Sequence, residues 1–468
     1  MIVLARILNP YDFGLVAITE VLIALIGVIG TAGISDFLLA YQKENEDEIF
    51  KASFWLNFLL SVIILVGFLV CLPYWAGYQH DARIVDLGWF VGGYFFASQV
   101  QSVPKTMLSR RLEFRTLVQI QNPFLIFIPV GKIICAYAGF GVYSLVIPTL
   151  LFSFVQCLLF FKYANFNPGW HLYIGRWGEI FSFSKNMVGT MLLARVASEG
   201  DKVILAGVLG LEQLGIYNMA FQMAQLYPNT VLGVTNNILS ATLPKFASNF
   251  VLLRAKYYSF LQVLAFVSVP IQVILAIAAG PIIELMYGAK WGAAILPFQI
   301  LSLFAIVRTL ASSSGAVLNT IGKPHVAFYI VLAYTPLHLL VSYGGSQFGI
   351  IGLSIGIVML KFAFLPVEIY TILKSMGSSI KEWFDCLKEV LIQNVLTIVA
   401  CIALILVFGF GTLQPLWQLG VFSVSYLLVL YGISRILYVP FLKRLSIKLS
   451  SLDKKYALIF NAVYRIKL

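Results

Sequence analysis

The chain has 468 residues, of which 60% are hydrophobic and only 11% are charged. Because soluble globular domains carry about a quarter charged residues, this composition excludes a soluble protein. The formal net charge of +12 leaves nucleic-acid binding to be judged from where the basic residues lie, and the five cysteines and four histidines show no metal-ligand or disulfide spacing.

Long apolar runs bounded by glycine, proline and charged residues predict membrane-spanning helices. A run of roughly 20 apolar residues matches a hydrocarbon core of about 30 Å at 1.5 Å per helical residue. The runs also lack the two-residue alternation of barrel strands. Thirteen spans are predicted, over residues 13–38, 50–72, 84–108, 117–138, 141–162, 180–209, 212–242, 255–280, 294–320, 325–343, 349–373, 388–409 and 415–438. The predicted fold class is therefore all-α, a polytopic transmembrane helical bundle.

Basic residues indicate how the bundle is oriented. Lysine and arginine crowd into one set of alternate loops and into the tail after residue 438, whereas the opposite loops hold only Arg6, Arg83 and Lys290. Because Lys and Arg are retained in cytoplasmic loops, the C-terminus is predicted to be cytoplasmic. The net charge then reflects topology and contact with anionic lipid headgroups, and no nucleic-acid partner is expected.

The sequence contains an internal repeat. LARILNPYDFG (4–14) aligns with LAGVLGLEQLG (205–215), which superposes Gly14 on Gly215. An offset of 201 residues indicates two related halves, although a match this short also arises by chance. The expected organisation is an N-terminal lobe of five spans, an inter-lobe linker, a C-terminal lobe of six spans, two additional spans and a basic tail, at 1–162, 163–179, 180–373, 374–438 and 439–468.

The repeat also bears on the N-terminus. Met1 corresponds to Lys202, so the first half lacks a counterpart of residues 180–201. Thirteen spans with a cytoplasmic C-terminus would place Met1 outside, with nothing upstream to carry it there. Both observations predict that an initial helix is missing from this sequence.

The stretch LLARVASEGDKVILAG (192–207) is unusually charged for its apolar surroundings. If it contained a loop, residues 228–243 would be left as a fragment too short to cross the membrane. If 180–209 is one helix, the turn falls at GLEQLG (210–215) and the following span crosses alone. The second interpretation is favoured.

On such a helix, Arg195, Glu199 and Lys202 follow i, i+4 and i+7 and share one face, whereas Asp201 points elsewhere. Charges inside a bilayer are costly and are expected to face protein or water. Two roles remain open for this face: an ion pair that only holds helices together, or the wall of a polar cavity.

Other predicted spans also carry ionisable residues. Arg308 and Lys361 lie near the middle of their spans, and Lys132 lies nearer a span end. Cations from several helices that converge on one cavity would suit an anionic substrate such as a phosphate or pyrophosphate. Acidic residues inside spans are Glu20, Glu199, Asp201 and Glu368.

Four segments carry a resemblance to a known group. They are ARILNPYDFGLVAI near the N-terminus, SVPKTMLSRRLEFR (102–115), LARVASEGDKVILAGVLGLEQLGIYNMA (193–220) and ELMYGAKWGAAILPFQILSLFAIVRTLASSSGAVLNTIGKP (284–324). The sequence resembles the Wzx-type polysaccharide (O-antigen or exopolysaccharide) flippases, within the superfamily of multidrug and peptidoglycan-precursor exporters. The resemblance covers essentially the whole chain, through diffuse motifs. Such proteins usually have fourteen helices, which form two six-helix lobes around a cavity and two additional helices. The resemblance therefore implies that the one helix absent from the thirteen predicted spans is the first.

The resemblance implies export of a polyprenyl-pyrophosphate-linked oligosaccharide across the bacterial cytoplasmic membrane by alternating access, without catalysis, cofactor or metal. It implies that the pyrophosphate or acidic sugars contact Arg195, Arg308 and Lys361, and more weakly Lys202 and Lys132. It implies coupling to a proton or sodium gradient through Glu20, Glu199, Asp201 or Glu368. Expected partners are the lipid-linked oligosaccharide, membrane lipids, and a polysaccharide polymerase and glycosyltransferases.

Two other functions compete with this one. A drug/cation antiporter of the same superfamily predicts an acidic cavity, which the mid-span Arg308 and Lys361 oppose. A membrane polysaccharide polymerase or ligase needs a large external catalytic loop, whereas the longest outer loops here are 73–83 and 280–293. A purely structural scaffold leaves the central cations unexplained.

Overall fold

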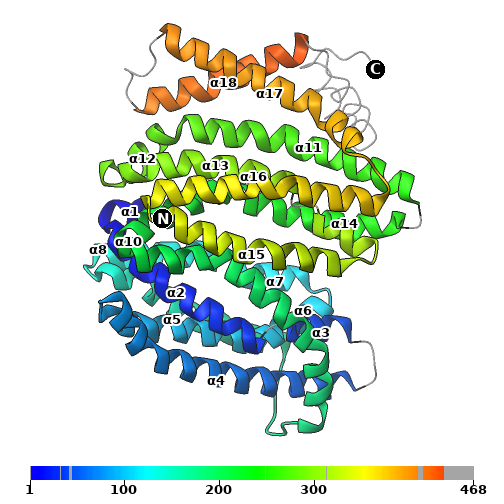
Figure 1. Cartoon of the computed structure of the whole chain (residues 1–468). Helices are drawn as coiled ribbons and strands as arrows, with labels where there is room; N and C mark the ends of the chain where they lie inside the picture. The colour runs from blue at the N-terminus through cyan, green and yellow to red at the C-terminus, as the bar shows by residue number, and fades with distance from the viewer. Residues whose placement is uncertain are drawn as a thin grey trace. The chain divides into compact units, whose positions relative to one another are not determined.

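The computed structural model describes residues 2–31, 33–41, 45–247, 249–311, 314–408 and 415–436, and every regular element in these ranges is helical (Figure 1). The predicted tail, 439–468, lies outside them. The α-helices are α1 (Ile2–Ile7), α2 (Pro10–Thr31), α3 (Ile34–Ala40), α4 (Glu46–Gln79), α5 (Arg83–Val100), α6 (Ser102–Arg110), α7 (Phe114–Gln121), α8 (Phe124–Tyr137), α9 (Ile147–Ala164), α10 (Trp177–Thr242), α11 (Phe250–Ile277), α12 (Ala279–Tyr287), α13 (Ile295–Ala311), α14 (Ser314–Thr320), α15 (Pro324–Ser346), α16 (Gly349–Met376), α17 (Ile380–Phe408) and α18 (Pro415–Ile436). Four short 3-10 helices are η1 (Gly141–Leu145), η2 (Ile174–Arg176), η3 (Leu243–Phe246) and η4 (Ala289–Ala294).

The multi-pass membrane architecture is confirmed. Nine segments of the described ranges are long and apolar enough to cross a bilayer: Pro10–Val28, Glu46–Gln79, Phe114–Tyr137, Gly141–Ala164, Met191–Val231, Phe250–Ile277, Ala289–Thr320, His325–Ser346 and Gly349–Met376. The total of thirteen spans stays a prediction.

Some predicted spans are broken into two helices. The span predicted at 84–108 consists of α5 and α6, which meet at Gln101. Pro104 lies in the first turn of α6, and because proline has no N–H it cannot bond to the carbonyl four residues earlier. The span predicted at 13–38 is divided in the same way into α2 and α3, and Gly33 between them has a left-handed backbone with φ 87°.

The chain forms two compact units. Unit 1 comprises residues 1–218 and 331–353, and unit 2 comprises 219–330 and 354–468. Helices α10, α15 and α16 each contribute to both units. The predicted lobes, 1–162 and 180–373, divide the chain elsewhere and stay a prediction.

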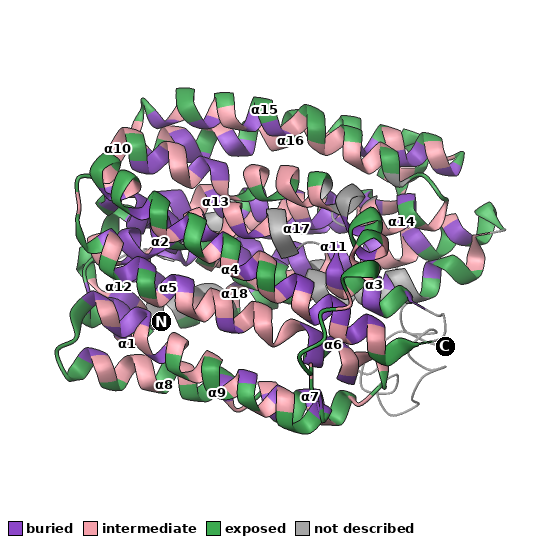
Figure 2. Cartoon of the chain, turned by 90° about the horizontal axis from the view of Figure 1, so that it is seen from below, coloured by how far each residue is buried: buried purple, intermediate pink, exposed green. Residues whose placement is uncertain are grey.

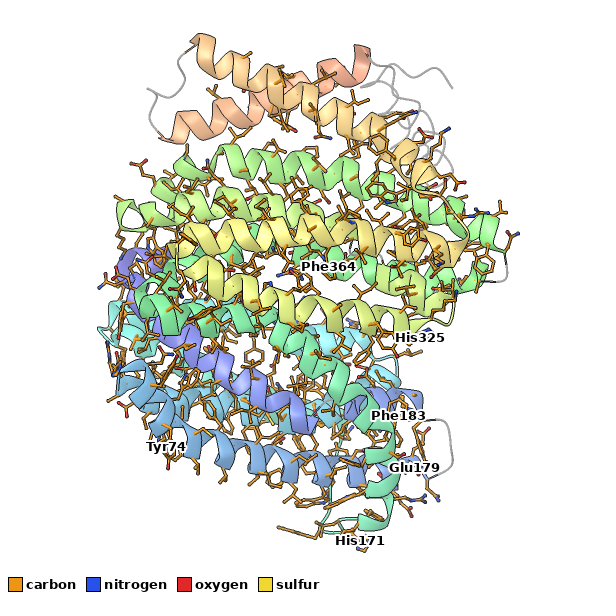
Figure 3. All side chains as sticks on the ribbon, in the orientation of Figure 1. Tyr74, His171, Glu179, Phe183, His325 and Phe364 are labelled. Carbon is orange, nitrogen blue, oxygen red and sulfur yellow. The ribbon has the colours of Figure 1, made fainter. Side chains whose placement is uncertain are left out.

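Unit 1 is a helical bundle with a continuous apolar core. Helix α2 packs on α4 and α5, α5 packs on α9, and α8 packs on α9. Its outward sides are also apolar: Leu125 of α8 is 72% exposed, and Tyr74, which points away from α4, is 80% exposed (Figures 2 and 3). Large exposed apolar surfaces of this kind mark contact with lipid. The linker predicted at 163–179 overlaps the end of α9, the segment that follows it, where His171 lies, and the first turn of α10, which carries Glu179 (Figure 3).

Unit 2 is built around α11. This helix packs on α13 and α17, and α17 and α18 form a pair (Figure 1). The core contains Tyr257 and Leu261 of α11, Leu373 of α16 and Leu387 of α17, all buried.

Helix α10 is a hairpin of two helices. Its 66 residues would extend about 99 Å if straight, roughly three times a hydrocarbon core. Gly210 breaks it with φ 82° and ψ 176°, a backbone that favours glycine. The hydroxyl of Tyr217 donates to Asp201 Oδ2 at 2.7 Å, although 16 residues of straight helix would separate the two by about 24 Å. The continuous helix predicted at 180–209 is therefore confirmed, and the predicted turn at 210–215 is narrower in the structure, where the break lies at Gly210 and residues 211–215 are helical.

The first half of the chain contains the same break. Helices α1 and α2 are interrupted at Leu8 and Asn9, which correspond to Leu209 and Gly210 under the 201-residue offset. This coincidence of backbone breaks supports the repeat that the sequence predicts.

Candidate functional site

The first half of α10 has one charged face. Lys202 Nζ lies 2.6 Å from Glu199 Oε2, and Arg195 lies 3.6 Å from the other Glu199 oxygen. The predicted i, i+4, i+7 grouping is therefore confirmed. Glu199 is shared by the two cations, so this face carries one positive charge in excess.

Asp201 lies away from this face, as predicted. It is 2% exposed. Its Oδ1 accepts a hydrogen bond from the backbone N–H of Lys202 at 2.9 Å, and its Oδ2 accepts one from the hydroxyl of Tyr217. Asp201 therefore belongs to the interior of the α10 hairpin, apart from Arg195 and its partners.

A pocket of about 520 Å³ opens beside Arg195 in unit 1. Half of the Arg195 side chain, 51%, is exposed, whereas its partner Glu199 is only 15% exposed. Arg195 and Asp36 bring opposite charges to the pocket wall, so it can offer both a guanidinium donor and a carboxylate acceptor. The lining residues come from α2, α3 and α10: Val28, Gly33, Ser35, Asp36, Met191, Ala194, Arg195 and Ser198.

A second polar group of unit 1 forms around Glu20. The hydroxyl of Tyr94, on α5, donates to Glu20 Oε1 of α2 at 2.8 Å. Lys132, on α8, is near enough to interact electrostatically with Glu20. Three helices thus bring a carboxylate, a phenol and an amine together.

In unit 2, both predicted cations contact polar partners. An Arg308 guanidinium N–H donates to Gln225 Oε1 in a short hydrogen bond, and Gln225 is 1% exposed. Lys361 Nζ lies 2.6 Å from Glu368 Oε1, two turns along α16, with 14% and 11% of their side chains exposed. A buried pair of opposite charges avoids the cost of an isolated charge in a membrane.

The predicted site residues thus fall into separate groups. Unit 1 contains Arg195 with Glu199 and Lys202, Asp201 with Tyr217, and Glu20 with Tyr94 and Lys132, while unit 2 contains Arg308 with Gln225 and Lys361 with Glu368. Convergence of Arg195, Arg308 and Lys361 on one cavity stays a prediction.

Sequence reasoning missed the neutral partners of these charges. Each of three neutral residues forms a hydrogen bond with a predicted ionisable residue: Tyr94, Tyr217 and Gln225. A phenol or amide inside an apolar run of sequence does not indicate which residue it will contact. His338 was also missed, because it has no histidine or cysteine near it in the sequence. It is 4% exposed on α15, four residues after Tyr334, and that spacing is the available signal.

The model of a family described as "Polysaccharide biosynthesis protein" matches residues 3–296. WzxC of Escherichia coli (strain K12), a lipopolysaccharide biosynthesis protein, is 21% identical over 387 residues, or 82% of this chain and 78% of the relative. ExoT of Rhizobium meliloti (strain 1021), a succinoglycan biosynthesis transport protein, is 24% identical over 338 residues, or 70% of this chain and 67% of the relative.

A solved structure extends the comparison to the fold. The lipid II flippase MurJ, in its inward closed conformation, has a TM-score of 0.71, with 14% identity. The match covers 93% of this chain and 97% of that one. The two proteins share one fold over nearly their whole length.

Proposed function

Because the chain belongs to the polysaccharide biosynthesis protein family, we propose that it moves a lipid-linked oligosaccharide from the inner to the outer leaflet of the bacterial cytoplasmic membrane. The carrier would be a polyprenyl pyrophosphate. The family match, with relatives named for lipopolysaccharide biosynthesis and succinoglycan transport, supports this proposal. The chain acts as a transporter and makes or breaks no covalent bond in its substrate.

The observation that carries the proposal within the molecule is the pocket beside Arg195. A half-exposed guanidinium inside a membrane helix can form bidentate hydrogen bonds with a phosphate. Ser35 and Ser198 add hydroxyl groups to the same wall, and the Ser198 hydroxyl donates to the backbone carbonyl of Arg195. Arg195 is the first anchor for the pyrophosphate or an acidic sugar.

The remaining cations have secondary roles in this proposal. Arg308 and Lys361 contact the substrate from the second lobe, and Lys202 and Lys132 contribute more weakly. Lys361 and Lys202 each lie 2.6 Å from a carboxylate, so an anion must compete with Glu368 or Glu199 for them. Glu20, Glu199, Asp201 and Glu368 are the candidate carboxylates for coupling to an ion gradient.

Alternating access supplies the movement. Two lobes, 1–162 and 180–373, rock about the central cavity, and the spans in 374–438 flank them. The C-terminus is cytoplasmic, on the side where glycosyltransferases assemble the lipid-linked repeat unit. A polymerase receives the oligosaccharide on the opposite side.

The test is complementation of cells that lack the gene. Arg195→Ala should reduce export of the repeat unit roughly 10- to 100-fold, the equivalent of about 1.5–3 kcal/mol for a hydrogen bond to a charged group. Lipid-linked repeat units should then accumulate facing the cytoplasm. Arg195→Lys keeps the positive charge but loses the bidentate geometry of the guanidinium. Its export rate should therefore lie between those of the wild type and Arg195→Ala.

Arg115→Ala is the matched control, because Arg115 is exposed on α7 and lies outside the pocket. It should complement fully. Normal surface polysaccharide in the deletion strain, together with altered drug tolerance, would instead support the antiporter. Accumulation of repeat units already on the outer face would support a polymerase or ligase.

A further inference from the structure

Asp201 is a buried carboxyl group that substrate binding does not explain. It is 2% exposed, and both of its hydrogen-bond donors, the Tyr217 hydroxyl and the Lys202 backbone N–H, are neutral. Within the described part of the chain, no lysine, arginine or histidine side chain forms an ion pair with it. Because an ionised carboxylate inside a membrane is costly, this group favours the arrival of a neutralising cation.

A chain of polar rings leads away from Asp201. Tyr217 is fully buried and interacts electrostatically with Tyr334 of α15. The Tyr334 hydroxyl lies 3.4 Å from Nδ1 of His338, and the two rings stack with centroids 5.4 Å apart. Residues 331–353 and the first half of α10 both belong to unit 1, and a Cβ on Gly200 would collide with Leu339, so α15 packs directly on this segment.

The polar face of α15 extends beyond His338. Ser342, one turn further on, is fully buried, and its hydroxyl has no hydrogen-bond partner within the described residues. Tyr334, His338 and Ser342 follow i, i+4 and i+8, so they share one side of the helix. A buried polar face on a membrane helix indicates a path for an ion rather than a lipid contact.

We propose that Asp201, Tyr217, Tyr334 and His338 form a proton-binding site that couples a proton gradient to transport. This inference rests on the proposed function and selects Asp201 from the four candidate coupling carboxylates. Tyr217 donates a hydrogen bond to Asp201, Tyr334 contacts His338, and the two phenols interact electrostatically with each other. A phenol hydroxyl can both donate and accept a hydrogen bond, and histidine changes its charge near neutral pH. The other charges of this part of α10, Arg195, Glu199 and Lys202, pair with one another instead.

The chemistry requires only a proton. A proton from water at one membrane face forms an N–H bond on His338 or an O–H bond on Asp201, and the same proton returns to water at the other face. No group is oxidised or reduced. While the proton is on Asp201, the hydrogen bond from Tyr217 loses its charge assistance, and charge-assisted hydrogen bonds are about twice as strong as neutral ones. This hydrogen bond joins the two arms of the α10 hairpin, so proton binding loosens the hairpin at Gly210.

The first test measures proton binding on the purified full-length protein. Infrared titration should show a protonated-carboxyl band that depends on pH and disappears in Asp201→Asn. Tyr217→Phe, which keeps the ring packing, should shift the midpoint of that band. An unchanged band in Asp201→Asn would overturn the site. His325→Gln, at an exposed histidine of the same helix, is the control and should leave the band unaltered.

The second test measures coupling in proteoliposomes that contain a lipid-linked oligosaccharide. An imposed pH gradient should accelerate flipping by the wild-type protein, and in Asp201→Asn and His338→Gln the rates with and without the gradient should become equal. Retained acceleration in both variants would contradict the proposal. If the wild-type protein flips no oligosaccharide, the proposed function fails, whereas the infrared titration still decides whether the proton site exists.

Discussion

Gly14 and Gly215 lie back to back, each against the backbone of the other's helix. A Cβ on Gly14 would overlap the carbonyl oxygen of Leu211, and a Cβ on Gly215 would overlap that of Pro10. The nitrogen atoms of the opposite glycines are 3.1 and 3.0 Å from these Cβ positions. Pro10 and Leu211 correspond to each other under the same offset as the two glycines, so the contact is reciprocal. The two repeats meet here about a local two-fold axis.

Gly14→Ala or Gly215→Ala should destabilise unit 1, because the added methyl group must displace a backbone carbonyl. Overpacking of this kind costs about 1–3 kcal/mol. The midpoint of thermal unfolding in detergent should fall for each variant. Gly67→Ala in α4, where nothing lies within 4 Å, is the control and should not lower it. Unchanged midpoints for both repeat variants would show that the helices separate without penalty.

Gly210→Ala should destabilise the α10 hairpin through its backbone alone. No atom lies within 4 Å of a Cβ at this position, but its φ of 82° with ψ of 176° is a conformation that is almost restricted to glycine and costs other residues about 1–3 kcal/mol. Gly189→Ala in the same helix also has open space and no positive φ, so it should be neutral or slightly stabilising. Thermal unfolding of the two variants side by side separates strain from packing, and equal midpoints would argue against strain at Gly210.

The pair of Lys361 and Glu368 should show strong coupling in stability. Replacing Lys361 by Met leaves Glu368 charged and mostly buried, and breaking a buried pair costs about 3–5 kcal/mol. The double variant Lys361→Met with Glu368→Leu should recover most of that loss. Denaturation of the four proteins in a double-mutant cycle measures the coupling. Additive effects would mean that the pair forms only weakly.

Stability should also depend on pH through Asp81, in the loop between α4 and α5. Burial raises the pKa of this carboxyl, but hydrogen bonds from Arg83 and Tyr11 outweigh it, so the net pKa lies below the ordinary 3.8. A lowered folded-state pKa stabilises the fold above the unfolded pKa, and that contribution is lost as the pH falls through the folded value. Asp81→Asn should therefore flatten the acid side of the stability profile below about pH 4. Unfolding midpoints across pH 3–6 check this, and an unaltered slope would contradict it.

The sequence was most informative where one helix contained the whole pattern. Arg195, Glu199 and Lys202 form a group at helical spacing, and that spacing alone predicts their shared face. The glycine-bounded turn was also predictable, because a loop at the charged stretch would have left residues 228–243 too short to cross the membrane. Contacts between helices were not predictable. Nothing in the sequence around Tyr217 indicates that its hydroxyl donates a hydrogen bond to Asp201, and His338 has no charged neighbour in the sequence. Gln101 likewise gave no sign that the predicted 84–108 span would divide there, because Pro104 alone often produces only a kink.

The hairpin at Gly210 has a consequence for how the chain is made. Arg195, Glu199, Asp201 and Lys202 each cost about 2.5–3.5 kcal/mol near the centre of an inserting segment, so the first arm of α10 is a poor substrate for the translocon by itself. The second arm emerges from the ribosome directly after the tight turn and carries Tyr217, which satisfies Asp201. We therefore expect the two arms to enter the bilayer as one unit, with insertion of the charged arm depending on residues synthesised after it.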